Sequence, residues 1–304
     1  MDISGKKIVV TGGAGFIGSN LVERLAKSNQ VTVVDNLHTG SKANLKGAIA
    51  TGNVKLLQAD SREIAKVGLS PDIIFHLGMY SSTPMYKENP HRVGEVVDGA
   101  ISVLEFAKEK KAKLVIASTS SLYNGRPTPY KEELLPLVSD YYTEARYCVE
   151  RLAELYYKLY GVDSVCLRLF SVYGPHEEAK KQYANLVTQF LWDMQRGEKP
   201  LVYGDGTQTR DFTYVDDVVD AFLKAVDAKG FDVFNVGTGK SYTINDMISK
   251  INSQMHTEIK PAYKPVDMTN YVMHTLADTK KSAEVLGFRA KYTLDDGIAR
   301  LLGR

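Results

Sequence analysis

Apolar residues form short, nearly unbroken runs along the first half of this chain. The runs occupy residues 8–10, 31–34, 54–57, 73–75, 114–117 and 164–169. Most do not alternate with polar residues, which is typical of strands buried on both faces of a parallel sheet. Helical periodicity covers the intervening stretches 16–28, 92–110 and 141–160. Repeated strand–helix–strand units predict a doubly wound α/β fold with a parallel sheet.

The pattern changes after residue 169. Residues 176–200 predict one helix, 204–209 a loop, 215–227 a helix and 231–236 another apolar strand. We therefore expect a first domain over residues 1–170 and a smaller α+β domain over 171–304. Segments of about 211–237 are expected to return to the first domain. In helix 141–160, the apolar stripe is predicted to be core; its members are Leu152, Leu155, Tyr156 and Leu159.

Composition and charge exclude several classes of protein. The chain has 304 residues with 38 basic and 36 acidic side chains, and the net charge of +2 gives no support to nucleic-acid or polybasic membrane binding. Its two cysteines lie in no CxxC motif, its six histidines lack metal-ligand spacing, and no run of about 18 apolar residues occurs. We expect a cytoplasmic protein with no metal, no membrane span and no signal peptide.

A glycine-rich turn joins the first predicted strand to the first predicted helix, with the sequence TGGAGFIG. Gly12 permits a tight turn, Gly15 lets the backbone approach a pyrophosphate, and Gly18 allows the helix to pack closely on the strand. The N–H groups at the helix start, including those of Phe16 and Ile17, can then face the phosphates. A tight turn with no ligand is the alternative, and the strand before and helix after the motif disfavour it. The turn therefore predicts a dinucleotide site.

An acidic residue ends the second predicted strand. Asp35 lies 17 residues after Gly18, about where a carboxylate accepts the hydroxyls of an adenosine ribose, and Asn36 follows it. A carboxylate at this place repels a 2′-phosphate. The expected cofactor is therefore NAD rather than NADP.

The Gly-x-x-Gly-x-x-Gly spacing resembles that of the extended short-chain dehydrogenase/reductase family, and most of all its nucleotide-sugar 4-epimerases. Asp60 and Ser61 match the family's adenine-contacting pair, and Leu77 lies in a segment, HLG, that matches one beside the cofactor. The segments RLFSVYGP at 168–175 and TRDFTYVDD at 209–217 resemble two further family motifs. The resemblance covers nearly the whole chain. It implies an NAD-binding Rossmann domain over 1–170, a nucleotide-sugar-binding domain over 171–304, and a homodimer formed by helices 92–110 and 141–160.

In that family a tyrosine takes a proton from a sugar hydroxyl while hydride passes to the nicotinamide, and a lysine four residues later supplies positive charge. This chain contains no Tyr-x-x-x-Lys. Tyr142 and Arg146 have the matching spacing, with a glutamate four residues further on, whereas the second pair, Tyr147 and Arg151, places that glutamate out of register. We expect Tyr142 and Arg146 to be the catalytic pair and to contact NAD. Arginine keeps the charge but is larger and does not readily relay a proton, so a non-catalytic sensor remains an alternative.

The resemblance also assigns the hydroxyl partner of the reaction. Thr119, four residues before Tyr123, matches the residue that hydrogen-bonds the reacting sugar oxygen. Ser120 and Ser121 occupy the places where 4,6-dehydratases carry Asp-Glu, and decarboxylating relatives need a glutamate nearby. Neither serine can serve as an acid or base near neutral pH. Epimerisation is therefore expected rather than elimination.

Several residues match the substrate side of the family. Arg210 is predicted to bind the diphosphate, and Ser171 stands where relatives have an asparagine on the same diphosphate. Tyr203 is predicted to pack against the base, Ser120 to lie beside the sugar, and Thr275 to leave room for an N-acetyl group. The expected substrate is UDP-glucose or UDP-galactose, with N-acetyl forms admitted. A uronate epimerase and a 4-ketoreductase remain alternatives.

Overall fold

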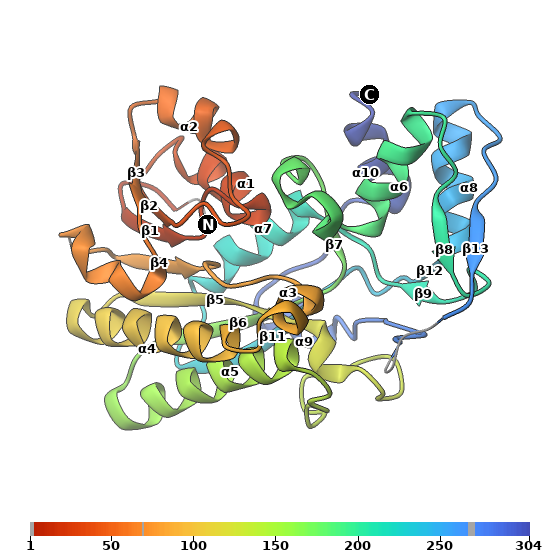
Figure 1. Ribbon diagram of the computed structural model, residues 1–304. Coiled ribbons are helices and arrows are strands. Elements are labelled where there is room, and N and C mark those ends of the chain that lie inside the picture. The colour runs from red at the N-terminus through yellow and green to blue at the C-terminus, as the bar shows by residue number, and fades with distance from the viewer. Residues whose placement is uncertain (1–2, 69, 267–270) are drawn as a thin grey trace.

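The main architecture is a parallel sheet with helices on both faces. The computed structural model describes residues 3–68, 70–266 and 271–304. Its seven-stranded sheet has the order β11-β6-β5-β4-β1-β2-β3 (Figure 1). These strands are β1 (Lys7–Thr11), β2 (Gln30–Asp35), β3 (Val54–Gln58), β4 (Ile73–His76), β5 (Lys113–Thr119), β6 (Ser164–Leu169) and β11 (Phe231–Val236). All adjacent pairs are parallel, so the predicted doubly wound α/β fold is confirmed.

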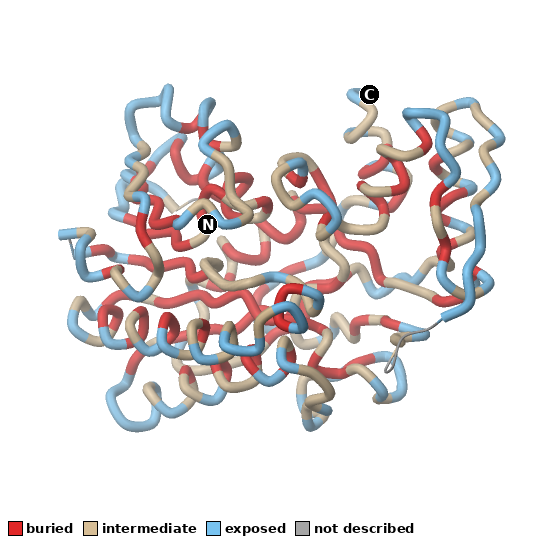
Figure 2. Tube along the Cα trace, viewed as in Figure 1, coloured by how far each residue is buried: buried red, intermediate tan, exposed pale blue. Residues whose placement is uncertain are grey.

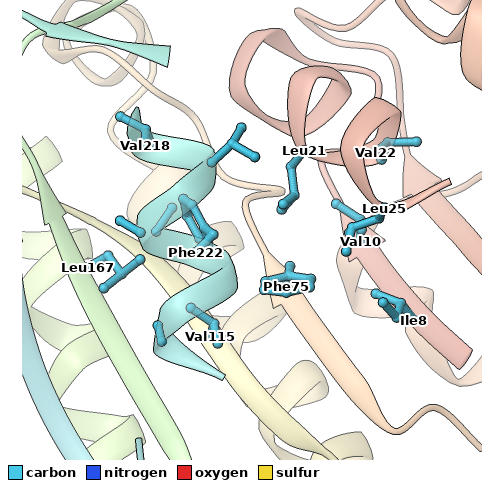
Figure 3. Close-up of a cluster of buried hydrophobic side chains, with 14 of the residues drawn as sticks. Ile8, Val10, Leu21, Val22, Leu25, Phe75, Val115, Leu167, Val218 and Phe222 are labelled. Atoms are coloured by element: carbon cyan, nitrogen blue, oxygen red, sulfur yellow. The ribbon is translucent and has the colours of Figure 1, made fainter. Parts of the chain in front are cut away.

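Alternate residues of each strand face opposite layers of helices. Ile8 and Val10 belong to one buried apolar cluster and Val9 to another. The first cluster joins the sheet to α1 (Phe16–Leu25) and α7 (Val215–Ala225), as Figure 3 shows. The second joins it to α4 (Arg92–Lys110) and α5 (Tyr141–Tyr160). Burial on both faces explains why the strands are apolar without alternation.

A smaller unit packs beside the carboxyl edge of the sheet. Its helices are α6 (Leu186–Gln195), α8 (Ile244–Met255) and α10 (Leu294–Leu301). Its short strands pair as β7 (Val172–Tyr173) with β10 (Thr213–Tyr214), β9 (Thr209–Arg210) with β12 (Tyr242–Thr243), and β8 (Leu201–Tyr203) with β13 (Ala262–Lys264). A third buried cluster, which includes Phe190, Phe212 and Met247, holds this unit together. Figure 2 shows buried segments of the chain in both the sheet and this smaller unit.

Short helical elements cover the connections. They are α2 (Lys46–Ala50), α3 (Thr83–Glu88), α9 (Lys280–Val285) and the 3₁₀ turns η1 (Lys42–Leu45), η2 (Ser61–Val67), η3 (Ser120–Tyr123) and η4 (Glu178–Tyr183). None of the helices in the described parts of the chain is long and apolar enough to cross a membrane.

The single helix predicted over residues 176–200 is wrong. The chain forms η4 and then α6, and Lys181 within η4 has a non-helical backbone, with φ 50° and ψ −122°. The buried Glu177 carboxylate accepts hydrogen bonds from the Asn185 N–H and the Thr188 hydroxyl, both at 2.7 Å. Asn185 then caps α6 through its own side chain. A buried acid thus organises a turn where the sequence pattern favours a continuous helix.

The predicted core stripe of α5 is also wrong in part. Leu155 is 45% and Leu159 60% exposed, whereas Ala145, Val149 and Ala153 are buried against α4 and the sheet. Small residues allow α5 to approach its neighbours closely, so its larger apolar residues lie further round the helix. The outer face of α5 is therefore apolar and exposed in the single chain.

Candidate active site

A large cavity of about 670 Å³ lies at the carboxyl edge of the sheet. Parallel α/β sheets bind ligands at this edge, where the strand order reverses, here between β1 and β4. The cavity lining includes every site residue predicted from the sequence except Tyr203. Tyr203 lies on β8 and is 41% exposed. Residues from both ends of the chain thus meet in one place.

The glycine turn forms a cradle that only glycine fits. Gly12 has φ +70°, and a Cβ there would lie 2.6 Å from the Leu77 carbonyl carbon. A Cβ on Gly18 would lie 2.1 Å from the Gly12 oxygen. Gly15 is the N-cap of α1 and provides no capping side chain, which leaves the first-turn N–H groups open to a ligand such as a pyrophosphate. The residues present therefore fit the phosphates of a dinucleotide.

Asp35 and Asp60 lie at the end of the cavity beside β2 and β3. Asp35 accepts the N–H groups of Leu37 at 2.7 Å and Ala14 at 2.9 Å, so each carboxylate oxygen retains a lone pair for a ribose hydroxyl. Burial raises the pKa of Asp35, and these backbone bonds oppose that rise. Burial also pushes the pKa of Asp60 upward, but its hydrogen bonds and charge contact with Arg62 prevail and lower it. Asn36 donates to Asp60 at 3.1 Å and links the two loops.

Tyr142 lies in the first turn of α5, directly against the cavity. The helix begins there because the Asp140 carboxylate accepts the Thr143 N–H at 2.8 Å in a capping box. Tyr147 and Arg151, the alternative pair, do not line the cavity, and Arg151 forms an exposed ion pair with Glu154. Of the two tyrosine–arginine pairs, only Tyr142 and Arg146 thus face the site.

Arg146 lies beside Tyr142 but directs its terminal donors elsewhere. The guanidinium carbon is 5.3 Å from the centre of the Tyr142 ring. Its terminal nitrogens donate to the Ala117 carbonyl at 3.1 Å and the Tyr80 carbonyl at 2.8 Å. The Nε atom is buried with no partner in the described chain. Arg146 therefore supplies positive charge at the ring while it ties the end of β5 to the loop after β4.

Thr119 is held by the turn that follows β5. Its hydroxyl oxygen accepts the Ser121 N–H at 3.1 Å, so its proton remains available to a ligand in the cavity. Behind it, Glu150 accepts the Ser118 hydroxyl at 2.5 Å and two Arg168 donors at 2.9 and 2.7 Å. Burial acts to lower the pKa of Arg168, but the bond and charge of Glu150 outweigh it and raise that pKa. A buried ion pair thus fixes the strand end.

On the substrate side, Arg210 is largely committed to the protein. It donates to the Thr209 carbonyl at 2.8 Å and the Val272 carbonyl at 2.7 Å, and burial lowers its pKa. Thr275 accepts the Asp211 N–H at 3.2 Å and lines the cavity. Ser171 lines it as well, with φ 29°. Arg210 therefore braces the segment around residue 272 as well as facing the cavity.

Lys180 is a cavity residue that sequence reasoning missed. Its ammonium lies 3.2 Å from the Glu177 carboxylate and 5.1 Å from the centre of the Phe16 ring, at the start of α1. The wrong helix prediction over 176–200 concealed it, because the Glu177–Lys180 spacing fits an exposed helical ion pair. His38, Tyr80 and Asn124 also line the cavity and were not identified from the sequence.

Comparison with known proteins gives the family. The sequence model described as "NAD dependent epimerase/dehydratase family" matches residues 8–237. UDP-glucuronic acid decarboxylase 3 of Arabidopsis thaliana is 32% identical over 302 residues, covering 96% of this chain and 86% of that protein. The UDP-N-acetylglucosamine 4-epimerase of Methanobrevibacter ruminantium M1, solved with UDP-N-acetylmuramic acid, is 29% identical with a TM-score of 0.92 over 99% of both chains. The UDP-glucose 4-epimerase of Thermotoga maritima, solved with UDP-glucose, is 32% identical with a TM-score of 0.89 over 96% of both.

Proposed function

Because this chain belongs to the NAD-dependent epimerase/dehydratase family and has NAD as its cofactor, we propose that it inverts C4 of a UDP-hexose or UDP-N-acetylhexosamine. The observation that carries the proposal is the position of Tyr142 and Thr119 in the same cavity as the glycine cradle. NAD bound in that cradle supplies reversible hydride acceptance at the sugar carbon.

The side chains around the sugar have complementary tasks. Tyr142 takes the proton of the C4 hydroxyl and later returns it, so no net proton is consumed. Thr119 donates its free proton to the same oxygen and fixes its position. Arg146 places a permanent positive charge beside the Tyr142 ring, which stabilises negative charge on the phenol oxygen, the form in which that oxygen can accept the sugar proton. These roles need no group beyond those lining the cavity and the cofactor.

The residues that line the cavity argue against decarboxylation of a uronate substrate. Its lining carboxylates in the described chain are Asp35, Asp60 and Glu95, and none of them belongs to the segment 118–121 that carries Thr119. Ser120 and Ser121 line the place where an acid–base residue for elimination is needed. The buried Arg146 and the half-buried Arg210 already donate to main-chain carbonyls. A neutral hexose thus fits better than a decarboxylation substrate, although decarboxylases are among the relatives.

The small side chain of Thr275 supports N-acetyl sugars as substrates. It lines the cavity with its hydroxyl oxygen occupied by the Asp211 N–H. A threonine leaves more space than a bulky residue for an acetamido group at C2. We propose that UDP-N-acetylglucosamine is turned over as well as UDP-glucose.

Proton NMR with each UDP-sugar in turn tests the proposal. UDP-glucose, UDP-N-acetylglucosamine and UDP-glucuronate are incubated with the protein, with and without added NAD. We expect the C4 epimer from one or both neutral sugars and none from the uronate. Tyr142→Phe is expected to lower kcat by about 10²- to 10⁴-fold, whereas Tyr147→Phe, outside the cavity, serves as the matched control.

A binding protein without chemistry is the second candidate, and the commitment of the Arg146 donors favours it. Such a sensor would bind UDP-sugars with the same affinity in wild type and Tyr142→Phe, and no epimer would form even with NAD present. Net accumulation of NADH would instead indicate a dehydrogenase or ketoreductase.

We also propose a homodimer formed through the outer faces of α4 and α5. Ile101 on α4 and Leu155, Leu159 and Tyr160 on α5 are 37–60% exposed. Exposed apolar residues gathered on adjacent helices mark a surface for association. A second copy of the chain is the occupant that the family resemblance implies.

A further inference from the structure

Two aromatic side chains meet across the cofactor end of the cavity. His38 follows β2 and Tyr80 follows β4, and their ring centres are 5.1 Å apart at an interplanar angle of 86°. The sheet order places β1 between these strands. Because neighbouring strands lie about 4.8 Å apart, a contact between the two loops has to pass over the carboxyl end of β1. That end is where the glycine turn begins.

Several contacts hold Tyr80 in place. Its hydroxyl donates to Glu95 at 2.6 Å, and the Arg92 guanidinium lies 4.7 Å from its ring centre. Its carbonyl accepts Arg146 at 2.8 Å and the Tyr86 hydroxyl at 3.1 Å. Burial, aided by the Glu95 contact, raises the pKa of Tyr80 to about 12, so its hydroxyl stays a donor at neutral pH. The Tyr80 ring is therefore a rigid surface.

His38 is held far less firmly. It is exposed, and its backbone N–H donates to the Asn36 side-chain oxygen at 3.1 Å. Among the described residues, its ring makes an aromatic contact with Tyr80 and no hydrogen bond or ion pair. Rotation of one side chain can therefore open or close the contact without moving the sheet.

Both rings line the same cavity as Asp35, Asn36 and Asp60. We propose that His38 and Tyr80 form an aromatic clasp over the dinucleotide, which closes after NAD has entered and slows its release. An enzyme that returns its hydride within one turnover gains from a cofactor that stays bound. The clasp concerns NAD binding, so it stands independently of which sugar is converted.

The contact has a bounded strength. An edge-to-face aromatic pair contributes an amount that corresponds to about a 2- to 12-fold change in a rate or equilibrium constant. We therefore expect His38→Ala to release the dinucleotide about 2- to 12-fold faster than wild type. His38→Phe, which keeps an aromatic ring, is expected to release it at nearly the wild-type rate.

Release can be measured without any sugar. The protein is loaded with NADH and mixed rapidly with excess NAD, and the loss of bound-NADH fluorescence gives the dissociation rate. His91→Ala is the matched control, because His91 is exposed and lies outside the cavity lining. Tyr156→Leu is the control for Tyr80→Leu, since the Tyr156 hydroxyl also donates to a glutamate of α4, Glu105, at 2.7 Å.

A double variant separates the clasp from two independent effects. If the rings act through each other, His38→Ala combined with Tyr80→Leu releases NADH no more than about twofold faster than the faster single variant. Unchanged release in His38→Ala overturns the proposal, as does equal acceleration in His38→Phe and His38→Ala. If the wild-type protein forms no epimer but the NADH release rates of the variants follow the predicted pattern, the proposed function fails and the clasp stands.

Discussion

Arg146 donates to the main-chain carbonyl of Tyr80 at 2.8 Å, from a helix to a loop 66 residues away in the sequence. With its bond to Ala117, this contact joins the tyrosine-bearing helix α5 to the ends of β4 and β5. The side chain that replaces the usual lysine is therefore both a charge beside Tyr142 and a tie between three segments of the site.

Changing Arg146 should separate these two roles. Arg146→Lys keeps the charge, but a single ammonium cannot reproduce the planar set of donors. We expect the free energy of unfolding to fall by about 1–3 kcal/mol, with kcat within about tenfold of wild type. Arg146→Met should show a similar loss of stability and a fall in kcat of about 10²-fold or more. Urea unfolding and initial rates measure the two effects, and equal kcat in both variants would remove the charge from the mechanism.

Lys180 should matter for ligand binding rather than for chemistry. Its ammonium lies at the start of α1, beside the phosphate cradle, and a charge-assisted bond to a phosphate contributes about 1.5–3 kcal/mol. Lys180→Met is therefore expected to weaken binding of NAD or of UDP by about 10- to 100-fold, and calorimetry with each ligand shows which. The neighbouring Lys181 is exposed and outside the cavity lining, so Lys181→Met should bind as wild type does. Equal affinities in the two variants would exclude Lys180 from the site.

Much of the sheet and the cofactor end could be predicted because local chemistry determines them. The largely apolar stretch of residues 231–236 matches β11, and the predicted helices 92–110 and 141–160 match α4 and α5. The glycines of the phosphate turn are required by close backbone approaches, and these leave a sequence signal. The hydrogen-bond partners of Arg146 leave no such signal. Its spacing from Tyr142 is that of a catalytic cation, whichever groups its guanidinium contacts.

The errors have a common physical cause. Glu177 and Lys180 have helical spacing, but the glutamate is buried and accepts bonds from residues further along the chain. Leu155 and Leu159 are apolar in sequence, yet the small residues of α5 take the buried face. In both cases tertiary packing overrides a pattern that is local. The placements of Lys180, His38 and Tyr80 depend on contacts between distant segments and could not be found from spacing.

The exposed apolar face of α5 predicts association of two chains. Replacing Leu159, which is 60% exposed, by glutamate should leave the fold intact and convert a dimer to a monomer. Light scattering after size-exclusion chromatography measures the mass directly. Val285→Glu is the control, since Val285 is equally exposed, at 59%, but lies on α9. A wild-type monomer, or a dimer that survives Leu159→Glu, would contradict this interface.

The buried pair of Glu150 and Arg168 should show strong coupling. Both side chains are 4% exposed, so removing one partner leaves a buried charge with few bonds. We expect Glu150→Leu or Arg168→Met alone to cost about 3–5 kcal/mol of stability. The double variant should cost clearly less than the sum of the two, because neither charge then remains. Urea unfolding of all four proteins gives the coupling energy, and additive losses would show that the pair contributes no specific interaction.

His76 should make the protein sensitive to acid. Its Nδ1 lies 2.7 Å from the Thr11 hydroxyl, and burial, reinforced by the charge of Arg146, lowers its pKa to about 3. An unfolded histidine titrates near 6.5, so between about pH 6.5 and 3 the unfolded chain binds a proton that the folded one does not. The folded state therefore has its full stability with respect to His76 above pH 6.5 and loses stability as the pH falls toward 3.

The variant His76→Gln isolates this contribution, because it cannot titrate. At pH 7.5 it should be less stable than wild type, since a buried hydrogen bond and packing are disturbed. At pH 5.0 wild type should have lost about 2 kcal/mol that the variant retains, at about 1.4 kcal/mol per pH unit below 6.5. All other titratable groups are the same in the two proteins. The difference between the unfolding free energies of wild type and His76→Gln therefore reports His76 alone. If that difference is the same at both pH values, the pKa of His76 is not changed by folding.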